Sequence, residues 1–243
     1  MLKFSEIFWY QQTTVTALAL LQLLPLLGGA AVLAAGERRA AVIGGKVAAL
    51  LTLLVAVAVT VHIDPAVADL QLAERLPVIG YHAAVDGVSA IFILLTALLT
   101  LLLTLYGMSR GMLSPGRLFA VLLVAEGVVM TMLVTMNIAW FALASALNLA
   151  TVVFLLRRWA VSRAENQALA RFIQYQGFGW LLFVAGAIVL AWGHADVSNG
   201  RWSFDAFDLI HTPPLGKFQS AAFFLLFYGL AVRTPLFPLH GWL

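Results

Sequence analysis

The chain has 243 residues, of which 63% are hydrophobic and 10% are charged, and its formal net charge is +3. A soluble domain usually carries about 25% charged residues, so this composition excludes that class and predicts an integral membrane protein. Cysteine is absent, which excludes disulfides, thiolate metal sites and cysteine-held iron–sulfur clusters on this chain. The basic residues are scattered among the apolar runs, so no nucleic-acid-binding patch is predicted and the expected surroundings are a lipid bilayer.

The apolar runs are continuous and about 20 residues long, which predicts an all-α, polytopic transmembrane fold. Seven spans are predicted in chain order, at about 15–35, 41–62, 86–107, 118–136, 138–156, 169–192 and 218–233. The first run is too long for the apolar core of a secretory signal, so we interpret it as the first span. We expect one transmembrane domain over residues 1–243, without a separate soluble module.

The loops differ in charge. Nine basic residues fall in or near the loops after the first, third and fifth spans, and four fall on the opposite side, together with most of the acidic residues. The positive-inside rule therefore predicts that the N-terminus faces outward. The first long outer loop contains VADLQLAERL, residues 67–76, an amphipathic stretch that we expect to form a short interfacial helix.

An ionisable side chain, Glu126, lies inside the fourth predicted span, with apolar neighbours in LLVAEGVVM. Inserting such a group costs on the order of 3 kcal/mol, so acids within spans are functional by default. A carboxyl group that can change its protonation state is what a proton relay requires, which makes Glu126 a candidate ion-translocation residue. The alternative is a protonated side chain that hydrogen-bonds to a neighbouring helix.

The end of the seventh span, AVRTPLFPLHGWL at residues 231–243, combines a charge with two prolines. Arg233 is either an ion-translocation residue or a positive-inside residue whose side chain snorkels to the membrane surface. The residues after it are still apolar, and Pro235 and Pro238 each remove an amide donor, which predicts a helix break at membrane depth. His240 could titrate near neutral pH and pass protons onward, or serve as a structural hydrogen-bonding residue.

Three further polar side chains in the spans are expected to have a structural role. Asn148 in the fifth span and Gln174 and Gln176 in the sixth are explained by hydrogen bonds between helices. We recognise no catalytic or metal-ligating motif, and the glycine pairs lie in spans, where they cannot form phosphate loops.

Three stretches carry a family resemblance. They are YHAAVDGVSAIFILLTALLTLLLTLYG at 81–107, RFIQYQGFGW at 171–180 and AVRTPLFPLHGWL at 231–243. In this order they resemble the third-helix signature, the sixth-helix start and the seventh-helix break of the antiporter-like membrane subunits of respiratory complex I, especially the M-type chain. The first and third stretches are the more specific ones, and the match runs in order over nearly the whole chain.

The resemblance implies a fold, and it implies that ion translocation and redox chemistry take place on different subunits. In that family, two bundles of five helices are related by inverted topology, each bundle has a broken helix, and protons move along a row of buried charged residues. The family's subunits carry no redox cofactor, because other parts of the assembly oxidise NADH and reduce quinone. We therefore expect no cofactor on this chain, and we expect other membrane subunits of a multisubunit complex as its partners.

The chain departs from the family pattern in three ways. Ser145, Ala146 and Leu147 stand opposite the family's fifth-helix glutamate. Arg233 replaces the seventh-helix lysine, and arginine cannot release a proton near neutral pH. Glu126 is therefore a candidate partner for Arg233. The family also continues with further helices, so we expect the chain to be a fragment or the product of a split gene.

These features predict a membrane subunit of a complex I-related assembly that contributes to proton or sodium translocation coupled to NADH:quinone electron transfer. One alternative is a subunit of a non-redox system, either a multisubunit cation/proton antiporter or an inorganic-carbon accumulation complex. A non-conducting structural subunit is another. The expected location is the cell inner membrane, with a periplasmic N-terminus.

Overall fold

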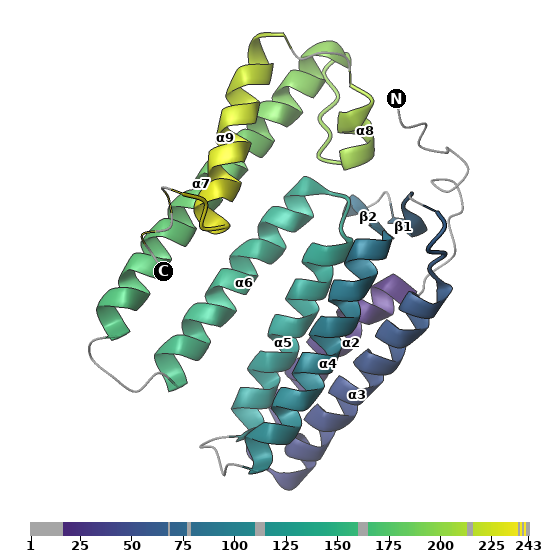
Figure 1. The fold of residues 1–243 in the computed structure, drawn as a ribbon, viewed down its shortest axis with the longest axis vertical. Helices are drawn as coiled ribbons and strands as arrows, with labels where there is room; N and C mark the ends of the chain where they lie inside the picture. Colours follow the sequence, from purple (N-terminus) through teal and green to yellow (C-terminus); the bar gives the residue numbers. More distant parts are fainter. Residues whose placement is uncertain are drawn as a thin grey trace. The chain divides into compact units, whose positions relative to one another are not determined.

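The computed structural model describes residues 17–67, 69–76, 79–109, 115–159, 165–212 and 216–237, together with Leu239 and Gly241. The prediction of an all-α polytopic membrane protein is confirmed, since six helices among these residues are long and apolar enough to cross a membrane. Large apolar side chains such as Leu27 and Val88 remain more than half exposed, as expected for helices that face lipid. The chain divides into two compact units, Met1–Thr135 and Met136–Leu243 (Figure 1).

The first unit is a bundle of four helices, α2 (Ala17–Ala35), α3 (Arg39–His62), α4 (Gly87–Ser109) and α5 (Pro115–Val134). Helix α2 packs against α3 and α5, and α4 packs against the same two helices, so the bundle is closed. Its core is apolar and contains side chains from all four helices, among them Leu21, Val59, Ile93 and Met130.

A β-hairpin stands where the sequence predicts an interfacial helix, so the expectation for residues 67–76 is wrong. Strand β1 (Gln71–Leu76) pairs in antiparallel fashion with β2 (Tyr81–Val85). Leu72 has a φ of 55°, at an irregularity in the strand register, and a helix cannot include that backbone conformation. The hairpin is more favourable than a helix for two reasons. Strand β2 forms backbone hydrogen bonds with β1, and β1 places a carboxylate at the N-terminus of α2.

That carboxylate is Glu74, which is 6% exposed. Its two oxygens accept hydrogen bonds from the backbone amides of Leu18 and Ala19, at 3.0 and 3.1 Å. Glu37, at the other end of the bundle's helices, similarly accepts from the amide of Gly116 at the start of α5, at 2.9 Å. A negative charge at a helix N-terminus satisfies free amides and complements the helix dipole, so both contacts stabilise the bundle.

The second unit contains α6 (Ile138–Trp159), α7 (Glu165–Val197), the short α8 (Ala206–Ile210) and α9 (Lys217–Arg233). Helix α7 packs along α9 and also against α6 (Figure 1). Glycine allows the close approach of α7 and α9, because a Cβ added at Gly229 would lie 2.6 Å from the backbone nitrogen of Phe183. Small residues let helix backbones pack closely within membranes, so this pair is built for contact along its length.

Each of the seven predicted spans corresponds to a helix, and the last of these helices is short. Six predicted spans correspond to α2 through α7, but the seventh, at 218–233, corresponds to α9, which has only 17 residues. A helix of that length covers about 26 Å, less than the hydrocarbon core of about 30 Å. It is short because Gly216, with a φ of 53°, precedes it and Pro235 follows it closely.

Candidate functional site

The candidate site begins at the end of α9. Helix α9 stops at Arg233, and Pro235 follows after one residue. Proline has no N–H, so it cannot donate to the carbonyl of Ala231, and the amide of Leu236 donates to that carbonyl at 3.1 Å. The last turn is therefore wider than an α-helical turn, and Arg233 lies where the regular backbone pattern ends.

The Arg233 side chain reaches a buried serine on α6. Its Nη1 atom donates a hydrogen bond to Oγ of Ser145 at 2.9 Å, and Ser145 is fully buried. The Ser145 hydroxyl in turn donates to the carbonyl of Ala142 at 3.3 Å. Trp180 of α7 donates from Nε1 to the same carbonyl at 2.9 Å. Arginine, serine and carbonyl thus form a chain of hydrogen bonds whose last acceptor is shared with an indole.

Helix α7 supplies the rest of the surroundings of Arg233. Gln176 is buried, and its Nε2 lies 3.5 Å from the Arg233 carbonyl, a long hydrogen bond to a group that the helix break leaves free. Gly179 leaves room for the arginine, since a Cβ there would lie 2.9 Å from Arg233 Cγ. Gln176, Gly179 and Trp180 are three and four residues apart, so they share one face of α7.

The chemistry of this site differs from that of an acid–base pair. Serine stays neutral and arginine stays protonated in proteins, so neither partner exchanges a proton near neutral pH. Among the described residues of the second unit, no carboxylate lies within ion-pair distance of the Arg233 guanidinium. The site can therefore hold a fixed positive charge and orient polar groups toward it.

Glu126 belongs to the first unit. It lies on α5, is 2% exposed, and neither carboxylate oxygen has a hydrogen-bond partner among the described residues. Leu123 and Met130, one turn before and after it on the same helix face, are fully buried. A carboxyl group without partners is costly in such surroundings, which marks Glu126 as a functional candidate. Its pairing with Arg233 stays a prediction.

The structure covers only part of the predicted site. Glu126, Arg233 and Pro235 lie within the described residues, whereas Pro238 and His240 lie outside them. The exposed Pro235 follows the end of α9, and its role in the ion path stays a prediction.

Sequence reasoning placed Ser145 opposite the missing acid but did not join it to Arg233. It also missed the contributions of Gly179 and Trp180. The sequence feature that could have identified them is their helical spacing within RFIQYQGFGW. Gly179 in that stretch is small enough to leave space for a long side chain such as Arg233.

The part of the chain that contains the Arg233–Ser145 contact also matches a known protein family. Residues 133–243, which contain α6, α7 and α9, match the family described as NADH:quinone oxidoreductase/Mrp antiporter, transmembrane. NADH-quinone oxidoreductase subunit M of Escherichia coli K12 is 25% identical over 169 residues, covering 68% of this chain and 33% of the relative. NAD(P)H-quinone oxidoreductase chain 4 1 of Synechococcus sp. JA-3-3Ab is 31% identical over 188 residues, covering 75% of this chain and 34% of the relative.

Solved structures share the fold. A chain of respiratory complex I from Thermus thermophilus matches 93% of this chain with 46% of its own length, at a TM-score of 0.71 and 26% identity. A chain of the Mrp complex from Dietzia sp. DQ12-45-1b matches 93% of this chain with 42% of its own, at a TM-score of 0.72 and 18% identity, which shows the fold alone.

The chain thus spans about a third of the length of these curated relatives and under half of the solved chains. The predicted resemblance is confirmed. The chain is similar to the antiporter-like membrane subunits of complex I-type assemblies, and its residues 133–243 match the family described as NADH:quinone oxidoreductase/Mrp antiporter.

Proposed function

We propose that the chain is a membrane subunit of a complex I-related assembly and contributes to proton or sodium translocation across an energy-coupling membrane. The observation that carries the proposal is the contact of Arg233, at the break after α9, with the buried Ser145 of α6. A charge held beside a helix break at membrane depth is a common element of ion pathways. Electron transfer from NADH to quinone would take place on other subunits of the assembly.

Within this proposal the two charged residues have different tasks. Glu126 carries the proton, because its carboxyl group is buried, has no hydrogen-bond partner among the described residues and can exist in two protonation states. Arg233 acts as a fixed charge that sets the potential along the path. His240 is proposed as a proton carrier beyond the helix break.

Ion flux in proteoliposomes that contain the purified assembly tests both tasks. We expect Glu126→Gln to lower flux by about a hundredfold, since positioned proton-transfer groups contribute on that order. Arg233→Ala should also lower flux, because it removes the fixed positive charge. Glu37→Gln is the matched control, because it also removes a carboxylate but lies outside the spans with 39% of its side chain exposed.

Unchanged flux in both Glu126→Gln and Arg233→Ala would overturn this assignment. That outcome would favour a second candidate function, a non-conducting structural subunit. The candidate is supported by the Arg233–Ser145 pair itself, because neither member exchanges a proton near neutral pH.

The description of the matching family, which names the Mrp antiporter, supports a non-redox alternative, a subunit of a multisubunit cation/proton antiporter. An inorganic-carbon accumulation complex is a related alternative. Flux driven by NADH and quinone would support the complex I-type role, whereas flux driven only by an opposing ion gradient would support the antiporter role. Subunits that purify with the chain provide a second readout.

We also propose that the chain resides in a cell inner membrane with a periplasmic N-terminus, on the basis of its basic loops. Cysteine is absent from the chain, so single cysteines can be introduced without background. In intact cells, an impermeant maleimide should label Asn199→Cys in the loop after α7 and should leave Gly36→Cys in the loop after α2 unlabelled. The reverse pattern would invert the topology.

A further inference from the structure

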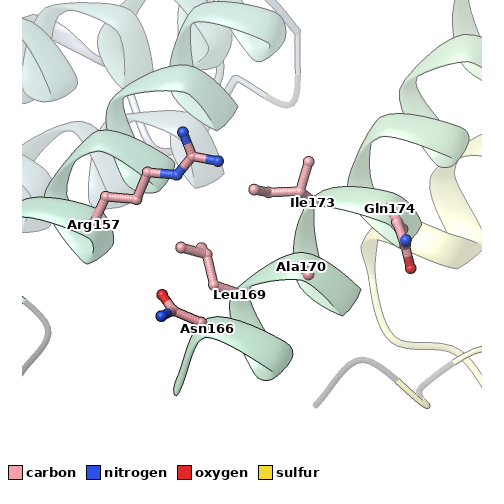
Figure 2. Close-up of a pocket in the computed structure, with 6 residues that line it drawn as sticks. All are labelled: Arg157, Asn166, Leu169, Ala170, Ile173 and Gln174. Atoms are coloured by element: carbon pink, nitrogen blue, oxygen red, sulfur yellow. The ribbon is translucent and has the colours of Figure 1, made fainter. Parts of the chain in front are cut away.

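A cavity of about 380 Å³ lies between the end of α6 and the first turns of α7, within the second unit. Figure 2 shows Arg157 extending from α6 across this space toward Leu169 and Ile173 of α7, with Asn166 beside them. Ala170 and Gln174 complete the lining. The lining therefore mixes polar side chains from both helices with apolar side chains of α7, and none of the lining residues is acidic.

The polar groups of the cavity are available for a ligand. No hydrogen bond or ion pair joins the Arg157 guanidinium or the Asn166 amide to another described residue. A guanidinium offers a planar fork of donors that fits two oxygens of a phosphate group. Arg157 and Asn166 face this space from different helices, so a single anion can bridge them.

The length and the polarity of α7 favour a position for this cavity at the level of lipid headgroups. Helix α7 has 33 residues and is about 50 Å long, whereas the hydrocarbon core is about 30 Å thick. Its surplus length is polar at the N-terminal end, where Asn166, Arg171 and Gln174 lie. Helix α6 ends at the same level with basic residues and Trp159, as helices do at the boundary between hydrocarbon and headgroups.

We propose that this cavity binds the headgroup of an anionic phospholipid. The phosphate accepts hydrogen bonds from Arg157 and Asn166, and the glycerol and the first carbons of the acyl chains cover Leu169 and Ile173. Basic pockets between transmembrane helices suit such lipids, because the charge attracts the phosphate while the apolar wall takes the chain. The inference is independent of whether the chain conducts ions.

The test measures the lipid that stays bound to the full chain, purified with any subunits that accompany it. The protein is exchanged into vesicles of equal phosphatidylglycerol and phosphatidylcholine, extracted in detergent and washed in about 1 M salt, where the screening length is about 3 Å. Bound lipid is then counted by mass spectrometry. We expect phosphatidylglycerol to be retained over phosphatidylcholine, and Arg157→Gln to reduce that retention by about tenfold or more.

Two further variants separate the cavity from general charge. Arg158→Gln removes the same charge from the next residue of α6, which does not line the cavity, and should retain the lipid. Ile173→Trp adds bulk to the apolar wall of the cavity and keeps the charge, so it should lower lipid retention even if Arg157→Gln fails to fold.

Three results would overturn the proposal. They are equal losses in the two arginine variants, full retention in Ile173→Trp, and displacement of phosphatidylglycerol by inorganic phosphate, which would indicate a site for free phosphate.

Discussion

Removal of the Ser145 hydroxyl provides a direct measure of how firmly Arg233 is held. Ser145 is fully buried, and its Oγ accepts from Arg233 Nη1 at 2.9 Å, so Ser145→Ala leaves that donor without its partner. Hydrogen bonds between neutral groups of membrane helices average about 0.6 kcal/mol. A bond to a charged group contributes about 1.5–3 kcal/mol. Because Arg233 is only half-buried, we expect a coupling energy of about 1–2 kcal/mol, between these two ranges.

A double-mutant cycle isolates that coupling. The free energy of unfolding is measured for the natural protein, Ser145→Ala, Arg233→Met and the double variant, and the departure from additivity is the coupling energy. Thr151→Val is the matched control on the same helix, about 9 Å further along the axis, where the hydroxyl donates to the carbonyl of Asn148. Thr151 and Arg233 should be additive within about 0.5 kcal/mol. The reasoning fails if Ser145 and Arg233 are equally additive.

Three further predictions concern a helix cap, a buried tyrosine and helix packing. Glu74→Ala should lower the free energy of unfolding by about 1–2 kcal/mol, because the buried carboxylate no longer caps α2. Glu37→Ala should lower it by less, because Glu37 is more exposed, and chemical denaturation of both variants measures the difference. Burial, followed by the nearby carboxylate of the hairpin, raises the pKa of Tyr81 above its ordinary value of about 10. Stability from the neutral phenol is therefore fully present below about pH 10 and falls as the pH rises further, and Tyr81→Phe should flatten that fall in thermal denaturation. Gly229→Ala should destabilise the protein by about 1–3 kcal/mol, since the added Cβ would lie 2.6 Å from the backbone of α7. Gly177→Ala is the control, because a Cβ there meets nothing within 4 Å. It should be neutral or slightly stabilising in the same thermal assay.

The membrane helices were predictable because the bilayer leaves an apolar segment of 20 residues few alternatives. The hairpin at 71–85 was not predictable from local pattern. Its first strand shows an amphipathic sequence that suits a helix, and the strand forms only because β2 lies beside it and Glu74 reaches the amides of α2. Strand β2 follows β1 after a short turn, and α2 lies 56 residues from Glu74, so both causes lie outside residues 67–76 and a reading of that stretch alone could not contain them.

The candidate site was predictable in its elements but not in its contacts. A charge followed by prolines marks the break after α9 from sequence alone, because proline removes a donor wherever it stands. The partner of Arg233 was not evident, since serine residues on small-faced helices ordinarily pack or bond to their own backbone. Here Ser145 does both, and it also accepts from the arginine. That extra contact depends on the space left at Gly179 and on the geometry of α7 against α9.

The resemblance implies an acid and a lysine where this chain has Ser145 and Arg233, and these two departures are physically consistent with each other. A lysine that lost its acidic partner within the membrane could release its proton, and the neutral amine would leave the site without a charge. Arginine cannot do so, and its fork of donors can be held by a neutral hydroxyl such as that of Ser145. The pair therefore keeps a positive charge at the helix break across the physiological pH range. If this region belongs to an ion path, a proton has to pass beside Arg233 on other groups, and replacing Arg233 should alter the rate through its charge.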